Sequence, residues 1–545
     1  MNPQAERADD VTKADLAVVA IVVLVGAMLR FWGPASFGID HYDEGVYVIS
    51  AMGLDDPSMP QRMFPDQIFF APPLYFGLVA LAHTISGGAL DTVAVLVSAF
   101  FGTLTIALVW WVGRGWFGPE AGICAAALLA LSDFHIALSR SALTDATFIF
   151  FFLLAAWSIV RALESGGILA ALLAGLATGL AWNTKYHGWM ALAAAAGAYV
   201  LLIIRRGWPE RWRRDVWVWL VMAGTAVALY LPWAAYVASL PGGYSRLTMH
   251  QRLFVESDWP TNLWMQVQRQ GYLDARLTDV SMLVAAAAAA LVMTARGGLA
   301  GRAIATLLIV AAGCWMFGGW AVVMVLALAG LLWTHHLVRL GPAMAATWLA
   351  LFVALTPFYR PYARLFLPLT LAACLLGGYG LARIVSWRRT GGHVIFEAIA
   401  SLACAAVIFV AIGREGRIAD SWRPSRGAAE AAASMASTIP RGSRVKVIEE
   451  PPLTYYLYRL GFDTLRDAAG VAVPADEPEP IYVVTGPYGH DAQLQSLGDR
   501  VQLKGTYRMR VKDLRLVDDI DPPYEEAQRE KELELKLYLV APPGG

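Results

Sequence analysis

The sequence predicts an α-helical membrane protein with many spans and a small α/β domain at its C-terminal end. Composition is the first reason: 57% of the 545 residues are hydrophobic and 16% are charged, whereas globular domains carry about 25% charged residues. The second is a series of apolar stretches near the length, about 20 residues, that crosses a bilayer as a helix. The third is a change of pattern after residue 413, where apolar stretches become short.

Thirteen apolar stretches are predicted to span the membrane, so we expect about 13 transmembrane helices. They cover 16–32, 92–112, 119–137, 146–162, 168–184, 187–204, 216–238, 280–295, 303–317, 319–334, 342–357, 365–384 and 394–413. The stretch 72–86 is ambiguous between a span and a helix in the membrane interface. The choice matters because one extra span inverts the side of the membrane for everything after it.

Basic residues decide between the two topologies, because cytoplasmic loops are enriched in Lys and Arg. With 72–86 in the interface and the N-terminus inside, the basic loop "RRGWPERWRR" at 205–214 is cytoplasmic. With 72–86 as a span, that loop faces outward. We therefore expect an interfacial helix at 72–86, a cytoplasmic N-terminus and an extracytoplasmic C-terminal region.

Two domains are expected: a transmembrane domain at 1–413 and a soluble, extracytoplasmic α/β domain at 414–545. In the second, the helical stretch "GAAEAAASMAS" precedes four strand-like segments, which read "RVKVIEE", "IYVVTG", "VQLKGTYRM" and "LKLYLV". Turn residues separate them. Glycines inside the predicted spans, in "GLATGLAWNTK" and "CLLGGYG", indicate close helix packing rather than phosphate-binding loops.

Charge and cysteine usage exclude some partners. The formal net charge is zero, so nothing in the overall charge points to nucleic acid. The four cysteines lie in apolar stretches without metal-ligand spacing and are expected to be small buried hydrophobes; they are Cys124, Cys314, Cys374 and Cys404. The segment His41-x-Asp43-Glu44 is only a weak signal for a metal. No cofactor is therefore assigned, and a divalent cation is left open.

Unusual polar residues gather at the predicted outer ends of the spans. Charged groups beside lipid are costly and usually functional. Acids there could serve an acceptor and cations an anionic group, together forming one site at the bilayer surface. These residues are Asp43 and Glu44 after the first span, Asp145 in "SRSALTDATFIF", Lys185 and His187 in "AWNTKYHGW", and Arg360, Tyr362 and Arg364 in "TPFYRPYARLFLP".

Each candidate also has a structural interpretation. The acid pair after the first span could be a solvated loop pair, although the scarcity of charge around it favours function. Asp145 could be the capping acid of a helix N-terminus, and capping and function are equally compatible with its position. The three cations could extend to lipid headgroups, which is the simpler interpretation for each taken alone.

The landmarks "HYDEGVY", "APPLYF", "ALSRSALTDATFIFFFLLA", "GLATGLAWNTK" and "RPYARLFLPLTLAA" follow one another between residue 16 and about residue 385. In this order the chain resembles the GT-C superfamily of polyprenyl-phosphate-sugar glycosyltransferases. The pattern is most similar to its protein O-mannosyltransferase and lipid A aminoarabinose transferase branch. The resemblance implies transfer of a sugar from a polyprenyl-phosphate carrier to a hydroxyl, or sometimes a phosphate, with inversion at the anomeric carbon. The expected partners are this donor, a lipid, glycan or protein acceptor, and the lipids of a bacterial plasma membrane.

The resemblance also implies roles for individual residues. Asp43 matches the first-loop acid that activates or orients the acceptor, Glu44 matches its neighbour, and Asp145 matches the second-loop acid. A carboxylate that accepts the attacking hydroxyl's proton contributes roughly 10²–10⁴ in rate. The phosphate that leaves gains charge, so nearby cations should stabilise it. For this we expect Arg364 as the main ligand with Arg360 or Lys185 as the second, and substrate contacts from His41, Tyr42, Tyr47, Tyr362 and His187.

The chain departs from the aminoarabinose transferases at several positions. Where they read Asp-Glu-Pro-Arg-Tyr, this chain has Asp-Glu-Gly45-Val46-Tyr. Ala71 stands in place of their lysine before the double proline, and Leu365 in place of a tyrosine. Lipid A is therefore not assigned as the acceptor.

Two other functions are weighed. A flippase or other transporter of lipid-linked sugars would place polar residues near the middle of the membrane, often on broken helices. Here the polar residues gather at one face. A non-catalytic receptor would not require acids and cations in five separate loops.

Overall fold

A computed structural model describes residues 12–55, 69–273, 339–388, 426–464, 479–486, 494, 497–512, 515, 518 and 532–542. Within it the chain divides into two compact units. The helical unit comprises Met1–Arg30, Phe100–Ala137 and Asp145–Asp420. The loop–sheet unit comprises Phe31–Ala99, Leu138–Thr144 and Ser421–Gly545. Four predicted spans (280–295, 303–317, 319–334 and 394–413) and the predicted domain boundary at 413–414 lie outside the described residues.

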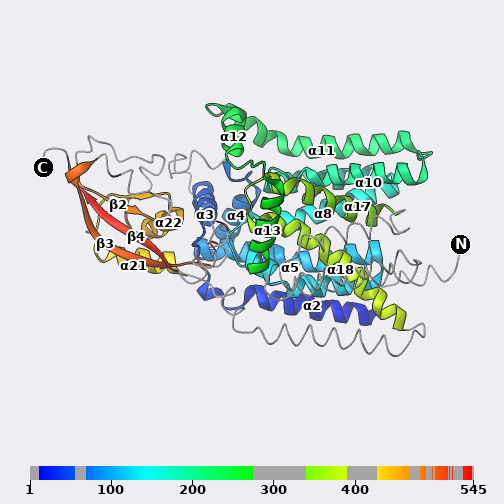
Figure 1. Cartoon of the computed structure of the whole chain (residues 1–545), viewed down its shortest axis with the longest axis horizontal. Helices are drawn as coiled ribbons and strands as arrows, with labels where there is room; N and C mark the ends of the chain where they lie inside the picture. Colours follow the sequence, from blue (N-terminus) through cyan, green and yellow to red (C-terminus); the bar gives the residue numbers. More distant parts are fainter. Residues whose placement is uncertain are drawn as a thin grey trace. The chain divides into compact units, whose positions relative to one another are not determined.

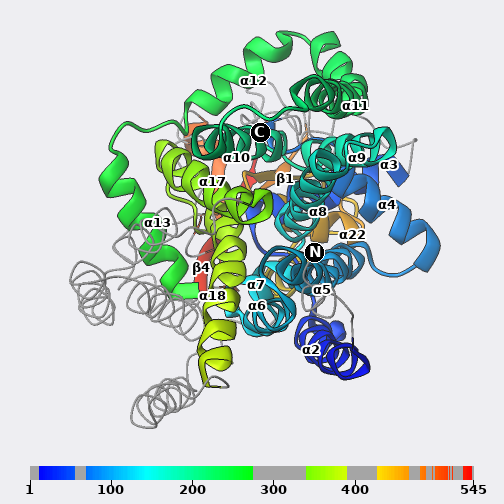
Figure 2. The ribbon, with the colours of Figure 1, turned by 90° about the vertical axis from the view of Figure 1, so that its right-hand side faces the viewer.

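Helices account for nearly all of the described helical unit (Figure 1). In chain order they are α2 (Lys13–Phe31), α5 (Leu90–Phe117), α6 (Pro119–Leu131), α7 (Asp133–Ser139), α8 (Thr144–Ser165), α9 (Ile168–Thr184), α10 (Met190–Arg206), α11 (Trp212–Ser239), α12 (Gly243–Arg252), α13 (Trp259–Leu273), α17 (Leu340–Leu355), η4 (Thr356–Phe358), η5 (Ala363–Phe366) and α18 (Leu367–Arg388). Four of them (α2, α5, α7 and α8) have one end in the other unit. Figure 2 looks along several of the helices, α2 and α6 among these, while α13 runs across the view, and α10 packs against α17.

Glycines let pairs of these helices approach closely. A Cβ atom on Gly175 of α9 would lie 2.6 Å from the carbonyl oxygen of Met222 in α11, and one on Gly378 of α18 would lie 2.6 Å from that of Ala121 in α6. Small residues permit such approaches between membrane helices, where packing drives association. The expectation that glycines of the two stretches serve helix packing is confirmed at Gly175 and Gly378.

Every predicted span within the described residues coincides with a helix, or with the pair α6 and α7. Five described helices are long and apolar enough to cross a membrane, or six if α6 and α7, which are bent by 63°, form one span. A membrane protein with several apolar helices is thus confirmed, and the count of 13 stays a prediction. The ambiguous stretch 72–86 forms α4 (Leu74–Ser86) of 13 residues. At about 1.5 Å per residue this helix is shorter than the roughly 30 Å hydrocarbon core.

A buried arginine lies at the break between α6 and α7. The Arg30 guanidinium donates to the carbonyl oxygens of Leu129 and Ala130, both at 3.1 Å, and one of its nitrogens lies 2.7 Å from His135 Nδ1. Carbonyls at the end of a helix have no partner within the helix. Arg30 adds donors to these two carbonyls, of which that of Leu129 also accepts the backbone N–H of Ser132, and this explains how a charged residue is accommodated at the end of an apolar helix.

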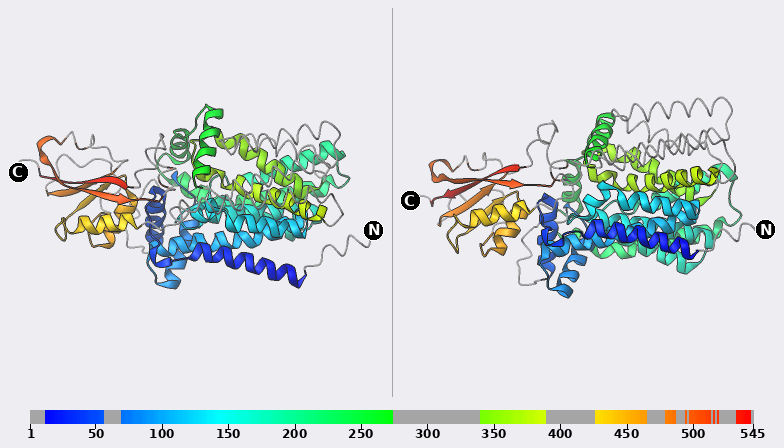
Figure 3. Two further views of the ribbon diagram at one scale, coloured as in Figure 1. Left: turned by 60° about the horizontal axis from the view of Figure 1, so that its bottom comes forward. Right: turned by 90° about the horizontal axis from the view of Figure 1, so that it is seen from below.

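The loop–sheet unit contains α3 (Tyr42–Asp55), α4 and a four-stranded sheet with two helices, α21 (Gly427–Ala436) and α22 (Pro451–Arg459). The strands are β1 (Val445–Ile448), β2 (Ile481–Thr485), β3 (Val501–Arg510) and β4 (Glu532–Val540). Their order is β1-β2-β4-β3, with β1 and β2 parallel and the other pairs antiparallel. The predicted helix and all four predicted strands are confirmed, and Figure 3 shows α21 alongside the sheet.

The first loop packs against the C-terminal region inside this unit. A Cβ atom on Gly45 of α3 would lie 2.4 Å from the backbone nitrogen of Pro452 in α22. Only glycine permits this distance between the two backbones. Helix α22 was not predicted, because its "PPLTYYLYR" opens with two prolines, which suit the first turn of a helix as well as a loop.

Candidate functional site

Helix α3 begins with a reciprocal capping arrangement in "HYDEG". The His41 Nδ1 atom accepts the backbone N–H of Asp43 at 3.1 Å. In return, Glu44 Oε2 accepts the backbone N–H groups of Asp40 at 2.9 Å and His41 at 3.0 Å. A residue at the helix cap and an acid three positions later thus satisfy backbone donors that the helix leaves free. The acid pair therefore lies on a rigidly held first turn, not in a solvated loop.

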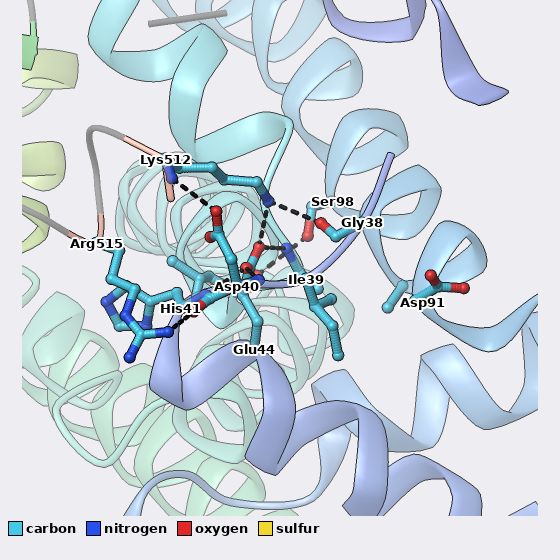
Figure 4. A network of polar contacts seen from close by, with 12 residues as sticks. Gly38, Ile39, Asp40, His41, Glu44, Asp91, Ser98, Lys512 and Arg515 are labelled. Atoms are coloured by element: carbon cyan, nitrogen blue, oxygen red, sulfur yellow. Dashed lines mark hydrogen bonds and ion pairs between the residues drawn. The ribbon is translucent and has the colours of Figure 1, made fainter. Parts of the chain in front are cut away.

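The other oxygen of the Glu44 carboxylate is also occupied. Oε1 accepts the backbone N–H of Ala142 at 2.8 Å and the ammonium of Lys512 at 2.9 Å. Lys512 also donates its Nζ to the carbonyl of Gly38 at 2.9 Å and its backbone N–H to Asp40 Oδ2 at 2.6 Å (Figure 4). With four hydrogen bonds, the Glu44 carboxylate connects the first loop to residue 142 and to Lys512.

Two carboxyl groups in this network have shifted pKa values. Burial raises the pKa of Asp40 to about 6, although Lys512 opposes the shift. Burial alone would raise the pKa of Glu44 as well, but the ammonium of Lys512 and the backbone N–H groups of Asp40 and His41 together hold it below its usual value. Glu44 is therefore an ionised acceptor of hydrogen bonds.

Asp43 is buried beside this cap, with a relative exposure of 8%. The ring of Tyr42 stacks on Phe70 with centroids 5.9 Å apart, and the Tyr47 ring meets Tyr75 edge to face at 5.7 Å. The Tyr75 hydroxyl in turn donates to the carbonyl of Ala94 at 3.0 Å. The aromatic side chains around Asp43 are thus anchored, and its role as a base stays a prediction.

The second acid pairs with one of the predicted cations. Lys185 Nζ donates to Asp145 Oδ1 at 2.6 Å, and the two side chains are 13% and 2% exposed. The other oxygen, Asp145 Oδ2, is buried and has no hydrogen-bond partner among the residues that the structure describes. The rings of Phe148 and His187 meet edge to face at 4.8 Å. One side of the carboxylate is neutralised, and the other is left as an acceptor.

The remaining cations lie on the connection between α17 and α18. The guanidinium carbons of Arg360 and Arg364 lie 5.8 Å and 5.3 Å from the ring centroid of Tyr362. Such cation–π contacts are attractive. Arg360 lies outside any helix or strand and Arg364 in the 3₁₀ turn η5. A shared aromatic ring, and not a helix face, brings the two arginines together.

Helix α13 holds this connection in place through polar side chains that sequence reasoning missed. Asn262 Nδ2 donates to the carbonyl of Pro357, Gln266 Nε2 to that of Thr356, and Arg269 to that of Pro361, each at 3.0 Å. The first two accepting residues are in η4. An amphipathic helix in a long loop gives no sequence signal for its target. Only the fold shows that α13 orders the segment with both arginines.

The structure thus brings the predicted site residues into three groups. His41, Tyr42, Asp43, Glu44 and Tyr47 share α3 and its cap, Asp145 contacts Lys185 close to His187, and Arg360, Tyr362 and Arg364 form the third. Phe352 of α17 lies between the second and third groups. Its ring is 6.3 Å from that of His187, and η4, which leads to Arg360, follows α17 directly. Sequence reasoning also missed Lys512 and Arg515, which have no distinguishing motif around them. Within the described part of the chain, no group of three or more His, Cys, Asp or Glu is placed to hold a metal ion.

Comparisons with known proteins agree with this architecture. The family model described as dolichyl-phosphate-mannose-protein mannosyltransferase matches residues 71–236. No curated protein sequence matches the chain. Among solved structures, ArnT from Cupriavidus metallidurans bound to undecaprenyl phosphate is similar with a TM-score of 0.54 and 16% identity, over 97% of this chain and 98% of that chain.

The same protein in the apo state gives a TM-score of 0.55 and 14% identity, over 96% and 97% of the two chains. The archaeal oligosaccharyltransferase AglB from Archaeoglobus fulgidus, in complex with an inhibitory peptide and a dolichol-phosphate, gives 0.54 and 13% identity, over 87% of this chain and 69% of its own. At these identities the structural likeness concerns the fold. This chain therefore shares its fold with these proteins, and its residues 71–236 match the mannosyltransferase family model.

Proposed function

We propose that this protein transfers a sugar from a polyprenyl-phosphate carrier to a hydroxyl or phosphate acceptor on the outer face of the membrane, with inversion at the anomeric carbon. The observation that carries the proposal is the carboxylate of Asp145. One of its oxygens is held by Lys185, and the other is buried without a described hydrogen-bond partner. A buried acceptor left unpaired is costly. A hydroxyl of a bound substrate would donate to it.

The reaction needs a base and an anion site. The acceptor oxygen attacks C1 of the sugar, the bond from C1 to the carrier phosphate breaks, and the acceptor proton passes to a carboxylate. We assign the proton to Asp43, the first-loop acid of the resemblance. Glu44 is not suited to that task because each of its oxygens already accepts two hydrogen bonds. We assign it to hold the first turn of α3.

The departing phosphate carries additional negative charge, which Arg364 is suited to stabilise. Arg364 is a partly exposed residue whose guanidinium lies over Tyr362, and Arg360 lies over the same ring. A guanidinium binds phosphate oxygens in bidentate fashion, which a lysine ammonium does not reproduce. The relatives bound to undecaprenyl phosphate and dolichol-phosphate support a polyprenyl phosphate as the carrier for this chain as well.

The test of transfer uses purified protein in nanodiscs with a radiolabelled polyprenyl-phosphate sugar. The acceptors are envelope extracts from cells that lack the gene, because such cells accumulate the unmodified acceptor. We expect label to move from the lipid carrier to a second product that mass spectrometry identifies. Movement of the labelled lipid across the bilayer of a vesicle without a second product would contradict the proposal and indicate a transporter.

Variants of the two acids test the assignments in the same assay. Asp43→Asn should keep the fold and donor affinity but lower turnover by about 10²-fold or more, because an amide does not accept the proton. Asp145→Asn should also lower turnover, since it removes the charge that orients the acceptor. Asp215→Asn is the matched control: Asp215 is a buried carboxylate whose partners are Tyr199 and Arg214. Normal turnover by a folded Asp43→Asn variant would refute its role as the base.

The donor site is tested by binding. A charge-assisted hydrogen bond contributes about 1.5–3 kcal/mol, so Arg364→Ala should weaken donor affinity about tenfold or more, and Arg364→Lys should recover part of it. Arg161→Ala is the control, because Arg161 is 64% exposed and pairs only loosely with Glu164 at 3.6 Å. Unchanged donor affinity in a stably folded Arg364→Ala variant would show that this arginine does not hold the phosphate.

A further inference from the structure

The segment that follows β3 inserts two cations into the first loop. Lys512 and Arg515 come from the C-terminal region, yet their side chains are 9% and 0% exposed and both donate to residues of the first loop (Figure 4). Arg515 also pairs with Glu450. The Lys512 ammonium reaches the Glu44 carboxylate across 468 positions in the sequence. Buried cations of this kind are retained only where they are paired.

Lys512 fastens both sides of the turn that precedes α3. On one side, its ammonium donates to the carbonyl of Gly38. On the other, the same ammonium donates to Glu44, and its backbone N–H donates to the carboxylate of Asp40. Lys512 thus contacts the turn at three points. Glu44, which it holds, in turn accepts the backbone N–H groups of Asp40 and His41.

Arg515 anchors the same turn to α22. Its guanidinium makes a bidentate pair with Glu450, at 2.9 Å and 2.7 Å, and donates to the carbonyl of Asp40. The preceding residue, Glu449, has a φ of 52°, which is unfavourable for a residue other than glycine. Together with the close approach of α3 to α22 at Gly45, these contacts fix the N-terminal ends of the two helices against each other.

From this geometry we propose that Lys512 is a positioning residue for sugar transfer. Its ammonium holds Glu44, and Glu44 holds the first turn of α3, which carries Asp43. The C-terminal region is then part of the machinery that orients the base. This inference rests on the proposed function. A loosely held first turn would allow Asp43 to adopt several orientations, and catalytic groups displaced by even an ångström lose much of their rate.

The test is Lys512→Met, which removes the ammonium and keeps most of the side chain's length. We expect turnover to fall about ten- to a hundredfold, the equivalent of one charge-assisted hydrogen bond, with donor affinity within twofold of the wild type. Lys504→Met is the matched control, because Lys504 is an exposed lysine of β3 in the same region, with Gln502 as its described hydrogen-bond partner. The control should turn over at the wild-type rate.

A mutant cycle separates positioning from general stability. If Lys512 acts through Glu44, the double variant Glu44→Gln/Lys512→Met should lose no more turnover than the worse single variant. Additive losses would overturn the inference, as would wild-type turnover by Lys512→Met.

Rates are expressed per folded protein, measured by size exclusion. If Lys512→Met does not fold, Lys512→Gln replaces it in the test, because its amide retains donors for Gly38 and Glu44 without the positive charge. Its turnover should fall at least about threefold. Wild-type turnover by this variant would again overturn the inference. Absence of transfer by the wild type would instead refute the proposed function itself.

Discussion

Replacement of Lys185 by methionine tests whether this residue is the partner of Asp145 or a ligand of the donor phosphate. The two groups are 2.6 Å apart, with side chains 13% and 2% exposed. Loss of the ammonium leaves the Asp145 carboxylate buried without its ion-pair partner. Removal of one partner of a buried pair costs about 3–5 kcal/mol. We expect the lower end of this range, because Lys185 retains some exposure.

The double variant Asp145→Asn/Lys185→Met should be more stable than Lys185→Met, because the buried charge is gone along with its partner. We expect its free energy of unfolding to be about 2 kcal/mol higher than that of Lys185→Met, because the neutral amide no longer requires the charge-assisted hydrogen bond that the carboxylate lost. The measurement is the free energy of unfolding in mixed micelles. Arg161→Met is the control, since its pair is exposed and contributes about 1 kcal/mol or less.

Donor affinity then distinguishes the two roles of Lys185. With its charge already committed to Asp145, a folded Lys185→Met variant should bind the donor within about threefold of the wild type, although turnover falls. A loss of donor affinity of tenfold or more, equal to that of Arg364→Ala, would show that Lys185 binds the phosphate. A double variant no more stable than Lys185→Met would refute the pairing argument itself.

Three further predictions follow from the loop–sheet unit and the topology. Burial raises the pKa of Asp40 to about 6, so between about pH 4 and 6 the folded state keeps a proton that the unfolded state releases. The contribution of Asp40 to stability therefore falls as the pH rises through that range. The stability of the wild type relative to Asp40→Asn, measured by thermal unfolding at each pH, should decline over the same range, and a constant difference would contradict the shift. Arg515→Met removes the bidentate partner of the buried Glu450 carboxylate, which should cost about 3–5 kcal/mol and expose the C-terminal region to protease, whereas unchanged proteolysis would refute the anchor. In intact cells with an accessible plasma membrane, a cysteine at Gly88 should react with an impermeant thiol reagent and one at Arg211 should not; labelling at residue 211 would overturn the topology.

The local sequence predicted most of the elements correctly because their signals are local. Apolar stretches near the length of a membrane span became helices, and short alternating segments became β1 to β4. The glycines of α9 and α18 were expected at helix contacts and are found there. Helix α22 was missed because two prolines at a helix start resemble a loop, and α12 and α13 were missed because they lie in a long polar loop between two predicted spans.

The roles of the charged residues were decided only by the tertiary structure. Asp43 and Glu44 are neighbours in sequence, yet both oxygens of Glu44 are already occupied by hydrogen bonds, one of them from the distant Lys512. Asp145 was equally compatible with a cap and a site, and its pairing with Lys185, 40 positions away, leaves one oxygen as a buried acceptor. A carboxylate's chemistry depends on which donors surround it within about 3 Å. Donors so distant in sequence meet it only once the chain has folded, so the sequence alone determined which residues were present and not what each one does.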